Sequence, residues 1–298
     1  MSFLSIVRDI KNIKIQGAQD IAKNSIKAIN IILEYYKKET KESLISNLKK
    51  AKNVLFTTRP TEPMMRNLLN YVLFDLEKER DVFSVVKLRI KSLEKRFEDV
   101  EKKISLYGSK KILNGNIIFT HCHSSNVINI LLTAKNLGKK FEVYNTETRP
   151  LFQGRKTATE LAKAGIPVTH FVDSAARIAL KKADLMLIGA DAISTEGKVV
   201  NKIGSEMFAE IAYKYDVPLY VCTDSLKFDP SSIFGYEEKI EKRKPSEVWP
   251  APPKGVKISN LCFERIKPEL ITGIISELGI FRPEIFVEEV KSSYPWLI

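Results

Sequence analysis

Three residues capable of proton and metal chemistry stand next to each other at positions 121 to 123. Cys122 lies between His121 and His123, directly after the apolar run 117–119. The chain has only three cysteines and three histidines, so half of these residues fall at three consecutive positions. Thiols and imidazoles bind metals, act as nucleophiles and exchange protons. The stretch is therefore a metal site, a nucleophile, an acid–base group or a crowded strand end.

Several of these chemistries lack the remaining residues that they need. Structural zinc sites pair their ligands at two places in a sequence, and the only other histidine here is His170. A serine hydrolase would need a G-x-S-x-G turn, and a nucleotide site a G-x-G-x-x-G or P-loop sequence. None of these is present. We therefore expect neither a metal nor a cofactor.

Cys122 and Asp191 remain as a candidate acid–base pair. A cysteine at the start of a helix and near cations has its thiolate favoured. An aspartate enclosed by an apolar pocket is shifted towards its neutral acid. A thiolate base and a protonated carboxyl group suit a proton shift on a sugar phosphate. The alternative is that Cys122 is a small buried hydrophobic residue, which is also the interpretation for Cys222 and Cys262.

The spacing of apolar residues changes along the chain. Up to residue 108 they recur every three or four positions, which predicts an N-terminal helical domain over residues 1–108 with four or five helices. After Gly115, short apolar runs alternate with helical stretches. This alternation predicts an α/β domain over residues 109–298, with a doubly wound, mostly parallel, Rossmann-like sheet.

Polar sequences follow five successive predicted strands. They are HCHSS at 121–125, TETRP at 146–150, DSAAR at 173–177, GAD at 189–191 and TDSLK at 223–227. Ligands of doubly wound sheets bind beyond the carboxyl ends of the strands, so these sequences predict a ligand site at one rim. Ser124, Ser125 and Ser174 also suit helix N-caps, which is the structural alternative for them.

Composition restricts the class of protein. The 298 residues carry a formal net charge of +12, but acidic residues interrupt the basic ones. A solvated lysine-rich surface is therefore favoured over RNA binding. No stretch approaches the roughly 18 apolar residues of a membrane span, no signal peptide is recognisable, and the cysteines form no disulfide framework. These features predict a cytoplasmic protein without a membrane partner.

The rim sequences resemble those of a known superfamily, the initiation-factor-2B-like sugar-phosphate isomerases. The matching stretches are THCHS at 120–124, TETRP at 146–150 with QG at 153–154, and GAD at 189–191 with NKIG at 201–204. The superfamily includes archaeal ribose-1,5-bisphosphate isomerases, methylthioribose-1-phosphate isomerases and the regulatory alpha, beta and delta subunits of initiation factor 2B. The likeness covers nearly the whole chain. In approximate length and in VDSAAR at 172–177, it is greatest to the archaeal ribose-1,5-bisphosphate isomerases.

The resemblance implies a reaction and a role for each matching residue. Cys122 would remove the proton from C2 of ribose 1,5-bisphosphate, and Asp191 would protonate the ring oxygen, giving ribulose 1,5-bisphosphate in AMP metabolism. The residues implied to bind the phosphorylated pentose are Gln16, Gly17, Ala18, Gln19, Arg59, Ser124, Ser125, Asn201, Lys202 and Lys227. Structural alternatives are a surface ion pair for Arg59 and a hydrophilic turn for Asn201 and Lys202. The resemblance also implies a homo-oligomer, either a dimer or a hexamer.

One position departs from the pattern of the resembled isomerases. They carry Arg-Gly-Ala near the N-terminus, whereas this chain reads IQGAQ at 15–19. Gln16 can hydrogen-bond an oxygen but brings no charge and no bidentate guanidinium. The departure favours a second hypothesis, in which the chain is a regulatory, non-catalytic relative that binds translation initiation factor 2, a sugar phosphate or a nucleotide. The pair Cys122 and Asp191 favours the isomerase.

Overall fold

The computed structural model describes residues 2–15, 17–59, 62–235 and 240–297. The chain divides into two compact units. The first is Met1–Asp99 with Tyr294–Ile298, and the second is Val100–Ser293. The boundary predicted at residue 108 lies inside helix α5 (Val82–Ser109), which belongs in part to each unit.

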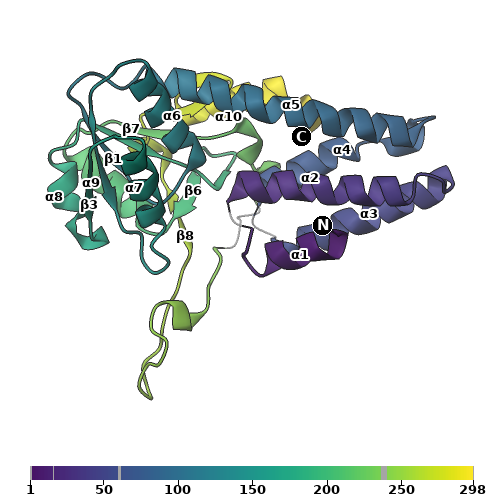
Figure 1. Ribbon diagram of the computed structural model, residues 1–298, viewed down its shortest axis with the longest axis horizontal. Coiled ribbons are helices and arrows are strands. Elements are labelled where there is room, and N and C mark those ends of the chain that lie inside the picture. The colour runs from purple at the N-terminus through teal and green to yellow at the C-terminus, as the bar shows by residue number, and fades with distance from the viewer. Residues whose placement is uncertain (1, 16, 60–61, 236–239, 298) are drawn as a thin grey trace. The chain divides into compact units, whose positions relative to one another are not determined.

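The first unit is a bundle of amphipathic helices, as the apolar spacing predicts. Besides the start of α5, its helices are α1 (Phe3–Lys11), α2 (Ala18–Tyr35), α3 (Lys41–Thr58) and α4 (Pro63–Val72). Ser2 forms a capping box with Ser5 at the start of α1, and the Thr40 side chain caps α3. The buried face of α2 includes Ile21 and Leu33. Helices α2 and α3 lie side by side in Figure 1.

The second unit is built on a mostly parallel sheet. Among the described residues its strands are β1 (Ile117–Thr120), β2 (Glu142–Thr146), β3 (Val168–Phe171), β4 (Leu185–Ile188), β7 (Leu219–Cys222), β9 (Gly273–Ser276) and β10 (Gly279–Phe281). Their order is β10-β9-β7-β4-β1-β2-β3, and only β10 pairs antiparallel. The chain winds one way from β1 and the other way from β4, so the topological switch lies between these two neighbours. The predicted doubly wound, Rossmann-like class is confirmed.

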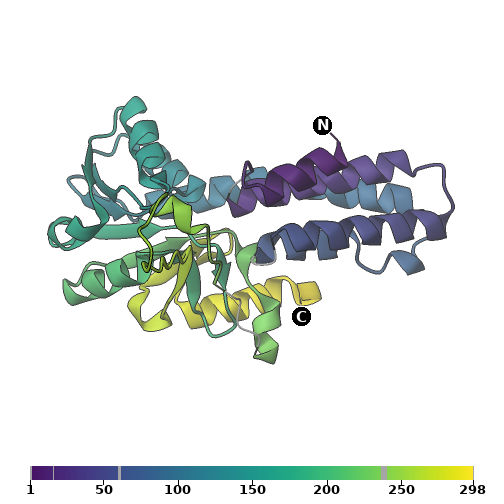
Figure 2. The same ribbon diagram turned by 90° about the horizontal axis from the view of Figure 1, so that it is seen from below.

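Helices cover both faces of this sheet (Figure 2). They are α6 (Ser125–Asn136), α7 (Gln153–Lys163), α8 (Ala176–Leu180), α9 (Ser205–Lys214) and α10 (Pro283–Ser293). Helices α6 and α7 pack together on one face, and α8 and α9 pack together on the other. One core cluster of this unit contains Ile118, Leu131, Leu161, Leu187 and Cys222. Cys222 is thus a buried apolar residue, as predicted.

A second, smaller sheet is absent from the sequence prediction. It contains β5 (Ala192–Ile193), β6 (Val199–Lys202) and β8 (Phe263–Ile266) in antiparallel order. Asn201 and Lys202 therefore lie in a strand, not in a hydrophilic turn. Between β7 and β8 the chain makes a long excursion, seen as the extended green loop in Figure 1. Among the described residues, no helix has the length and apolar content to cross a membrane.

Short 3-10 turns complete the described structure. They are Leu76–Lys78, Asp173–Ala175, Ser225–Lys227, Pro230–Phe234, Pro245–Glu247, Pro268–Leu270 and Pro295–Leu297.

Gly154 permits a close approach of α7 to the end of β2. A Cβ at this position would lie 1.7 Å from the carbonyl oxygen of Thr146. The carbonyl of Gly154 in turn accepts a hydrogen bond of 2.7 Å from the side-chain amide of Asn145. Because the obstacle is backbone, no side-chain rotation can relieve the clash.

We predict that Gly154→Ala lowers the free energy of unfolding by about 3 kcal/mol, the upper end for overpacked positions. Urea unfolding followed by circular dichroism measures this change. Gly115→Ala is the matched control, because Gly115 also lies beside a strand but has nothing within 4 Å of an added methyl group. Its positive φ of 85° should cost only about 1 kcal/mol. Equal losses in the two variants would contradict the packing argument.

Candidate active site

The loops that follow β1 and β4 meet at the topological switch. Cys122 lies in the first loop and Asp191 in the second. Gly189 allows the two loops to approach, because a Cβ there would come within 2.8 Å of Ser124 Oγ. The predicted rim is therefore the place where a doubly wound sheet binds its ligands.

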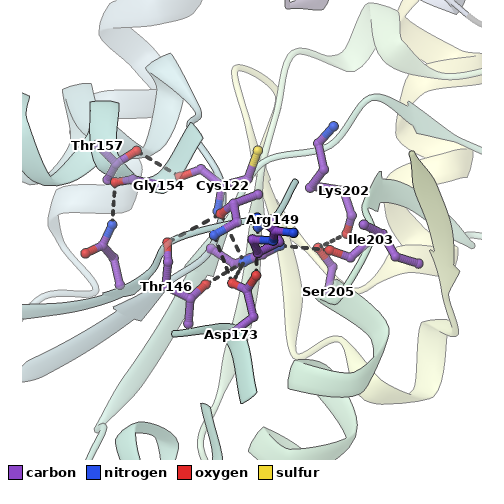
Figure 3. Close-up of polar contacts among 12 residues, drawn as sticks. Cys122, Thr146, Arg149, Gly154, Thr157, Asp173, Lys202, Ile203 and Ser205 are labelled. Atoms are coloured by element: carbon purple, nitrogen blue, oxygen red, sulfur yellow. Dashed lines mark hydrogen bonds and ion pairs between the residues drawn. The ribbon is translucent and has the colours of Figure 1, made fainter. Parts of the chain in front are cut away.

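Cys122 has a left-handed backbone that its neighbours hold from two sides (Figure 3). Its φ is 66°, which is uncommon for a residue with a Cβ. Its N–H donates to Thr148 Oγ1 at 3.0 Å, and its carbonyl accepts from Thr157 Oγ1 at 2.8 Å. Strained backbones of this kind persist where surrounding contacts over-determine them, often at functional sites.

The loop that carries Thr148 is itself fixed by Asp173. The N–H groups of Thr148 and Arg149 donate to the two carboxylate oxygens of Asp173, at 2.9 and 2.7 Å. Asp173 follows β3, so hydrogen bonds connect the ends of β1, β2 and β3 in one chain (Figure 3).

His121 is a buried, neutral side chain with a defined tautomer. Its Nε2 lies 3.0 Å from the carbonyl oxygen of Ile203, which can only accept, so Nε2 carries the proton. Nδ1 then accepts from Thr146 Oγ1 at 2.6 Å. Burial lowers the pKa of His121 to about 4, against the opposing charge of Asp173. Nδ1 thus connects the end of β1 to Thr146 in β2, and Nε2 connects it to Ile203, the residue after β6.

His123 also serves the local structure. The hydroxyl proton of Thr157 is donated to Cys122, so Nδ1 of His123, 3.1 Å from Thr157 Oγ1, acts as the donor to that oxygen. Within the described residues, no group of three or more His, Cys, Asp or Glu side chains is placed to hold a metal ion.

The thiol of Cys122 is harder to ionise than the sequence suggests. Burial raises its pKa to about 11, and the nearby charge of Asp191 adds to the rise. The cation of Lys202 acts in the opposite direction and is the leading influence that lowers the pKa. The expectation of a favoured thiolate at a helix start is therefore wrong for the ligand-free protein, because desolvation outweighs the favourable charges.

Three predicted site residues come from segments that follow β4 in the chain: Asp191 after β4, Lys202 in β6 and Lys227 after β7. The backbone N–H of Asp191 donates to Val200 in β6 at 2.8 Å. Lys227 Nζ donates to the carbonyl of Ala190 at 2.5 Å, next to Asp191. The charge of Asp191 acts on both Cys122 and Lys202, so thiol, carboxyl and ammonium share one electrostatic environment. The structure therefore brings the two predicted catalytic residues together.

Three of the predicted binding residues of the second unit are uncharged, namely Ser124, Ser125 and Asn201, and they differ in the hydrogen-bonding groups that are available to a ligand. Ser124 is the N-cap residue of α6 and Ser125 its first residue, but the Ser124 side chain forms no capping hydrogen bond. Nδ2 of Asn201 is buried without a hydrogen-bond partner among the described residues. By contrast, the start of α9 is occupied, since Glu264 Oε1 accepts from the Glu206 N–H at 2.7 Å. The amides of α6 and the amide of Asn201 thus suit a phosphate or hydroxyl group.

The remaining predicted residues belong to the first unit. Arg59 forms an ion pair with Glu62 at 3.1 Å, and both side chains are buried, unlike the surface pair of the structural alternative. Gly17 is the N-cap residue of α2, without a side-chain cap, and Ala18 and Gln19 begin the helix. Gln16 lies outside the described residues. Phosphate binding by this group stays a prediction.

Three features of the site are missing from the predicted set. Gln153 has a buried Oε1 without a hydrogen-bond partner among the described residues. His121 fixes the loop, and Cys262 accepts a hydrogen bond from Lys202 at 3.2 Å. Gln153 and His121 each had a sequence signal, the QG stretch at 153–154 and the THCHS stretch at 120–124, whereas Cys262 had none. The contact of Cys262 depends on the pairing of β6 with β8, which local pattern does not reveal.

The loops after β1 and β4 thus bring a thiol and a carboxyl group to the switch of a doubly wound, Rossmann-like sheet, where the charge of Lys202 acts on the thiol. The chain belongs to the Initiation factor 2 subunit family, which matches residues 14–283.

Two named relatives and one solved structure are similar over almost the full chain. The chain is 37% identical to the ribose 1,5-bisphosphate isomerase of Pyrococcus furiosus, over 98% of this chain and 94% of the relative. It is 36% identical to the protein of the same name from Thermococcus kodakarensis, over 99% and 95%. The crystal structure of the Pyrococcus horikoshii OT3 translation initiation factor eIF-2B matches with a TM-score of 0.84 and 28% identity, over 96% of this chain and 98% of that one.

We predict that His121 makes the second unit sensitive to acid. Because its folded pKa of about 4 lies below the ordinary value of 6.5, its stabilising effect is complete above pH 6.5 and is lost as the pH falls towards 4. The loss amounts to about 3 kcal/mol. In urea unfolding at several pH values, His121→Gln should be less stable at pH 7 but lose less stability between pH 7 and 4.

His170→Gln is the control, because His170 is an exposed histidine on β3. It should keep the wild-type loss between pH 7 and 4. Retention of the full loss in His121→Gln would show that another group causes it.

Proposed function

We propose that the protein converts ribose 1,5-bisphosphate to ribulose 1,5-bisphosphate, with Cys122 as base and Asp191 as acid. The observation that carries the proposal is the shared electrostatic environment of Cys122, Asp191 and Lys202 at the switch between β1 and β4. The names of the two archaeal relatives support the substrate. A place in AMP metabolism belongs to the same proposal.

The reaction requires two proton transfers in each half. The Cys122 thiolate removes the proton on C2, and that electron pair forms a C1–C2 double bond as the bond from C1 to the ring oxygen breaks. Asp191 gives its proton to the departing ring oxygen. In the second half, the carboxylate takes the proton of the C2 hydroxyl while the thiol returns a proton to C1. The product is a ketose with both phosphates retained, and Cys122 and Asp191 regain their starting protonation states.

The high pKa of Cys122 is compatible with this role. With a pKa of about 11, roughly one thiol in ten thousand is ionised at pH 7, which contributes up to about 5 kcal/mol to the barrier. The same value makes the thiolate a strong base, and a proton on carbon needs one. The charge of Lys202 already contributes to this value, and without it the thiol would be still harder to ionise.

The remaining predicted residues are the proposed contacts of the phosphorylated pentose. Ser124, Ser125, Asn201, Lys202 and Lys227 are the candidates in the second unit. Gln16, Gly17, Ala18, Gln19 and Arg59 are those in the first. A homo-oligomer in the cytoplasm, either a dimer or a hexamer, completes the proposal.

A regulatory role is the competing hypothesis, because one solved structure similar to this chain is a translation initiation factor eIF-2B. In that case the protein would bind translation initiation factor 2, a sugar phosphate or a nucleotide without turnover. Incubation with ribose 1,5-bisphosphate and detection of the ketose product separates the two hypotheses. Binding without product would favour regulation.

We predict that Cys122→Ser and Asp191→Asn each lower kcat by at least about a hundredfold, as expected for loss of a general base or acid. Product formation measured by coupled assay or by NMR tests this. Cys222→Ser is the matched control, since Cys222 is a buried cysteine outside the site, and it should retain turnover. Wild-type kcat in Cys122→Ser would remove Cys122 from the mechanism.

We also predict that Gln16→Arg tightens the binding of ribose 1,5-bisphosphate. A charged contact to phosphate contributes about 1.5 to 3 kcal/mol, which corresponds to roughly a tenfold to hundredfold lower Kd. Calorimetry on the inactive Cys122→Ser background measures binding without turnover. Ser46→Arg, at an exposed position of α3 outside the predicted binding residues, controls for a general gain of positive charge. Unchanged or weaker binding in Gln16→Arg would mean that position 16 does not contact a phosphate.

A further inference from the structure

The ammonium of Lys202 is held by unusual partners. Its Nζ donates to Cys262 Sγ at 3.2 Å and lies 4.8 Å from the centre of the Phe263 ring. Lys202 faces Phe263 across the antiparallel pair of β6 and β8. Among the described residues, no carboxylate forms an ion pair with this ammonium. Sulfur and a π face bind a cation less strongly than a carboxylate does, so the charge stays available to other groups.

The groups near the Lys202 ammonium include the two proposed catalytic residues. Burial lowers the pKa of Lys202, but Cys122, Cys262 and Asp191 raise it, and the net shift is upward. In return, the Lys202 charge is the leading influence that favours the Cys122 thiolate against burial. In Figure 3 the sulfur of Cys122 and the Nζ of Lys202 both extend away from the hydrogen-bonded cluster below them, on the same side.

Backbone hydrogen bonds hold Cys262 in the position from which its sulfur contacts the Lys202 ammonium. The N–H of Ile203 donates to the carbonyl of Cys262 at 3.0 Å, and the N–H of Cys262 donates to Glu241 at 3.0 Å. Its side chain packs with Ala192 and Val200 and is 7% exposed. Because the backbone and side chain of Cys262 are both fixed, its sulfur holds the Lys202 ammonium at one position.

We propose that Cys262 is a positioning residue that holds the Lys202 ammonium beside Cys122 and thereby sets the fraction of Cys122 present as thiolate. The titratable groups facing this cluster come from several elements. They are His121 after β1, Asp191 after β4, and Glu241, Arg243 and Glu247 in the excursion before β8. His121 stays neutral above pH 6.5, and Arg243 binds Glu247 at 2.7 Å, so neither replaces Lys202 as the cation near the thiol.

The consequence for catalysis rests on the proposed function, but the ionisation of Cys122 can be measured without any substrate. The test is the rate of alkylation of Cys122 by iodoacetamide between pH 6 and 11, read for each cysteine by peptide mass spectrometry. Iodoacetamide reacts with the thiolate, so the rate reports the ionised fraction. The full-length protein is used throughout.

In Cys262→Ala the ammonium loses its sulfur partner. We expect alkylation of Cys122 at pH 8 to slow about threefold to tenfold, with the midpoint shifted to higher pH. Cys262→Ser keeps an acceptor for Nζ and should restore a rate close to that of the wild type. Lys202→Met removes the cation and should slow alkylation at least as much as Cys262→Ala. Cys222→Ala, the loss of a buried thiol elsewhere, should leave the profile of Cys122 unchanged.

Three outcomes would overturn the proposal. One is a Cys262→Ala profile equal to that of the wild type or shifted to lower pH. Another is an equal shift in Cys262→Ser, since that would trace the effect to packing and not to the hydrogen bond. The third is a similar shift in Cys222→Ala. If the protein also turns over ribose 1,5-bisphosphate, Cys262→Ala should lower kcat and leave KM unchanged, whereas absence of turnover would leave the alkylation result valid.

Discussion

In the proposed mechanism, the partly buried ammonium of Lys202 determines how readily Cys122 acts as a base. Burial, together with the charge of Asp191, raises the pKa of the thiol to about 11. Of the groups around the thiol, the Lys202 cation is the strongest influence in the other direction. A buried acid–base site has to exclude water to strengthen its electrostatics, yet exclusion of water is what disfavours the thiolate. A cation whose contacts are with neutral groups favours the thiolate, because no carboxylate neutralises its charge.

The fold supplies that placement through hydrogen bonds from neutral groups. His121 joins the end of β1 to Ile203, the residue after Lys202, while Ile203 donates to Cys262. Cys122 and Lys202 are thus held by one connected set of hydrogen bonds, although Cys122 lies in the loop after β1 and Lys202 in β6 of the smaller sheet. A neutral histidine suits this role, because a charged one would add a second cation beside Lys202 at the cost of desolvation.

The sequence predicted five strands of the second unit, because buried strands of a parallel sheet are readable from local apolar runs, and it placed Cys122 and Asp191 after two of them. Their catalytic roles stay a prediction. Strands β9 and β10 and helix α10 were not predicted. The sequence also missed the sheet of β5, β6 and β8. β5 is only two residues long, and β8 pairs with a strand far along the chain. For the same reason Cys262 was interpreted as apolar only. The thiolate expectation failed differently: burial of a side chain, which decides the pKa here, cannot be read from neighbours in sequence.

The charge of the substrate makes the neutral groups of the site important. Each phosphate brings negative charge, which would raise the pKa of Cys122 further if it lay near the thiol. If Lys202 bound a phosphate directly, it would also lose much of its effect on the thiolate. Phosphate is therefore better received by neutral donors, and the start of α6 and the buried amide of Asn201 provide them. By this argument the amides bind the phosphate, whereas Lys202, held by Cys262, serves the proposed base and contacts the substrate through a hydroxyl group and not through a phosphate.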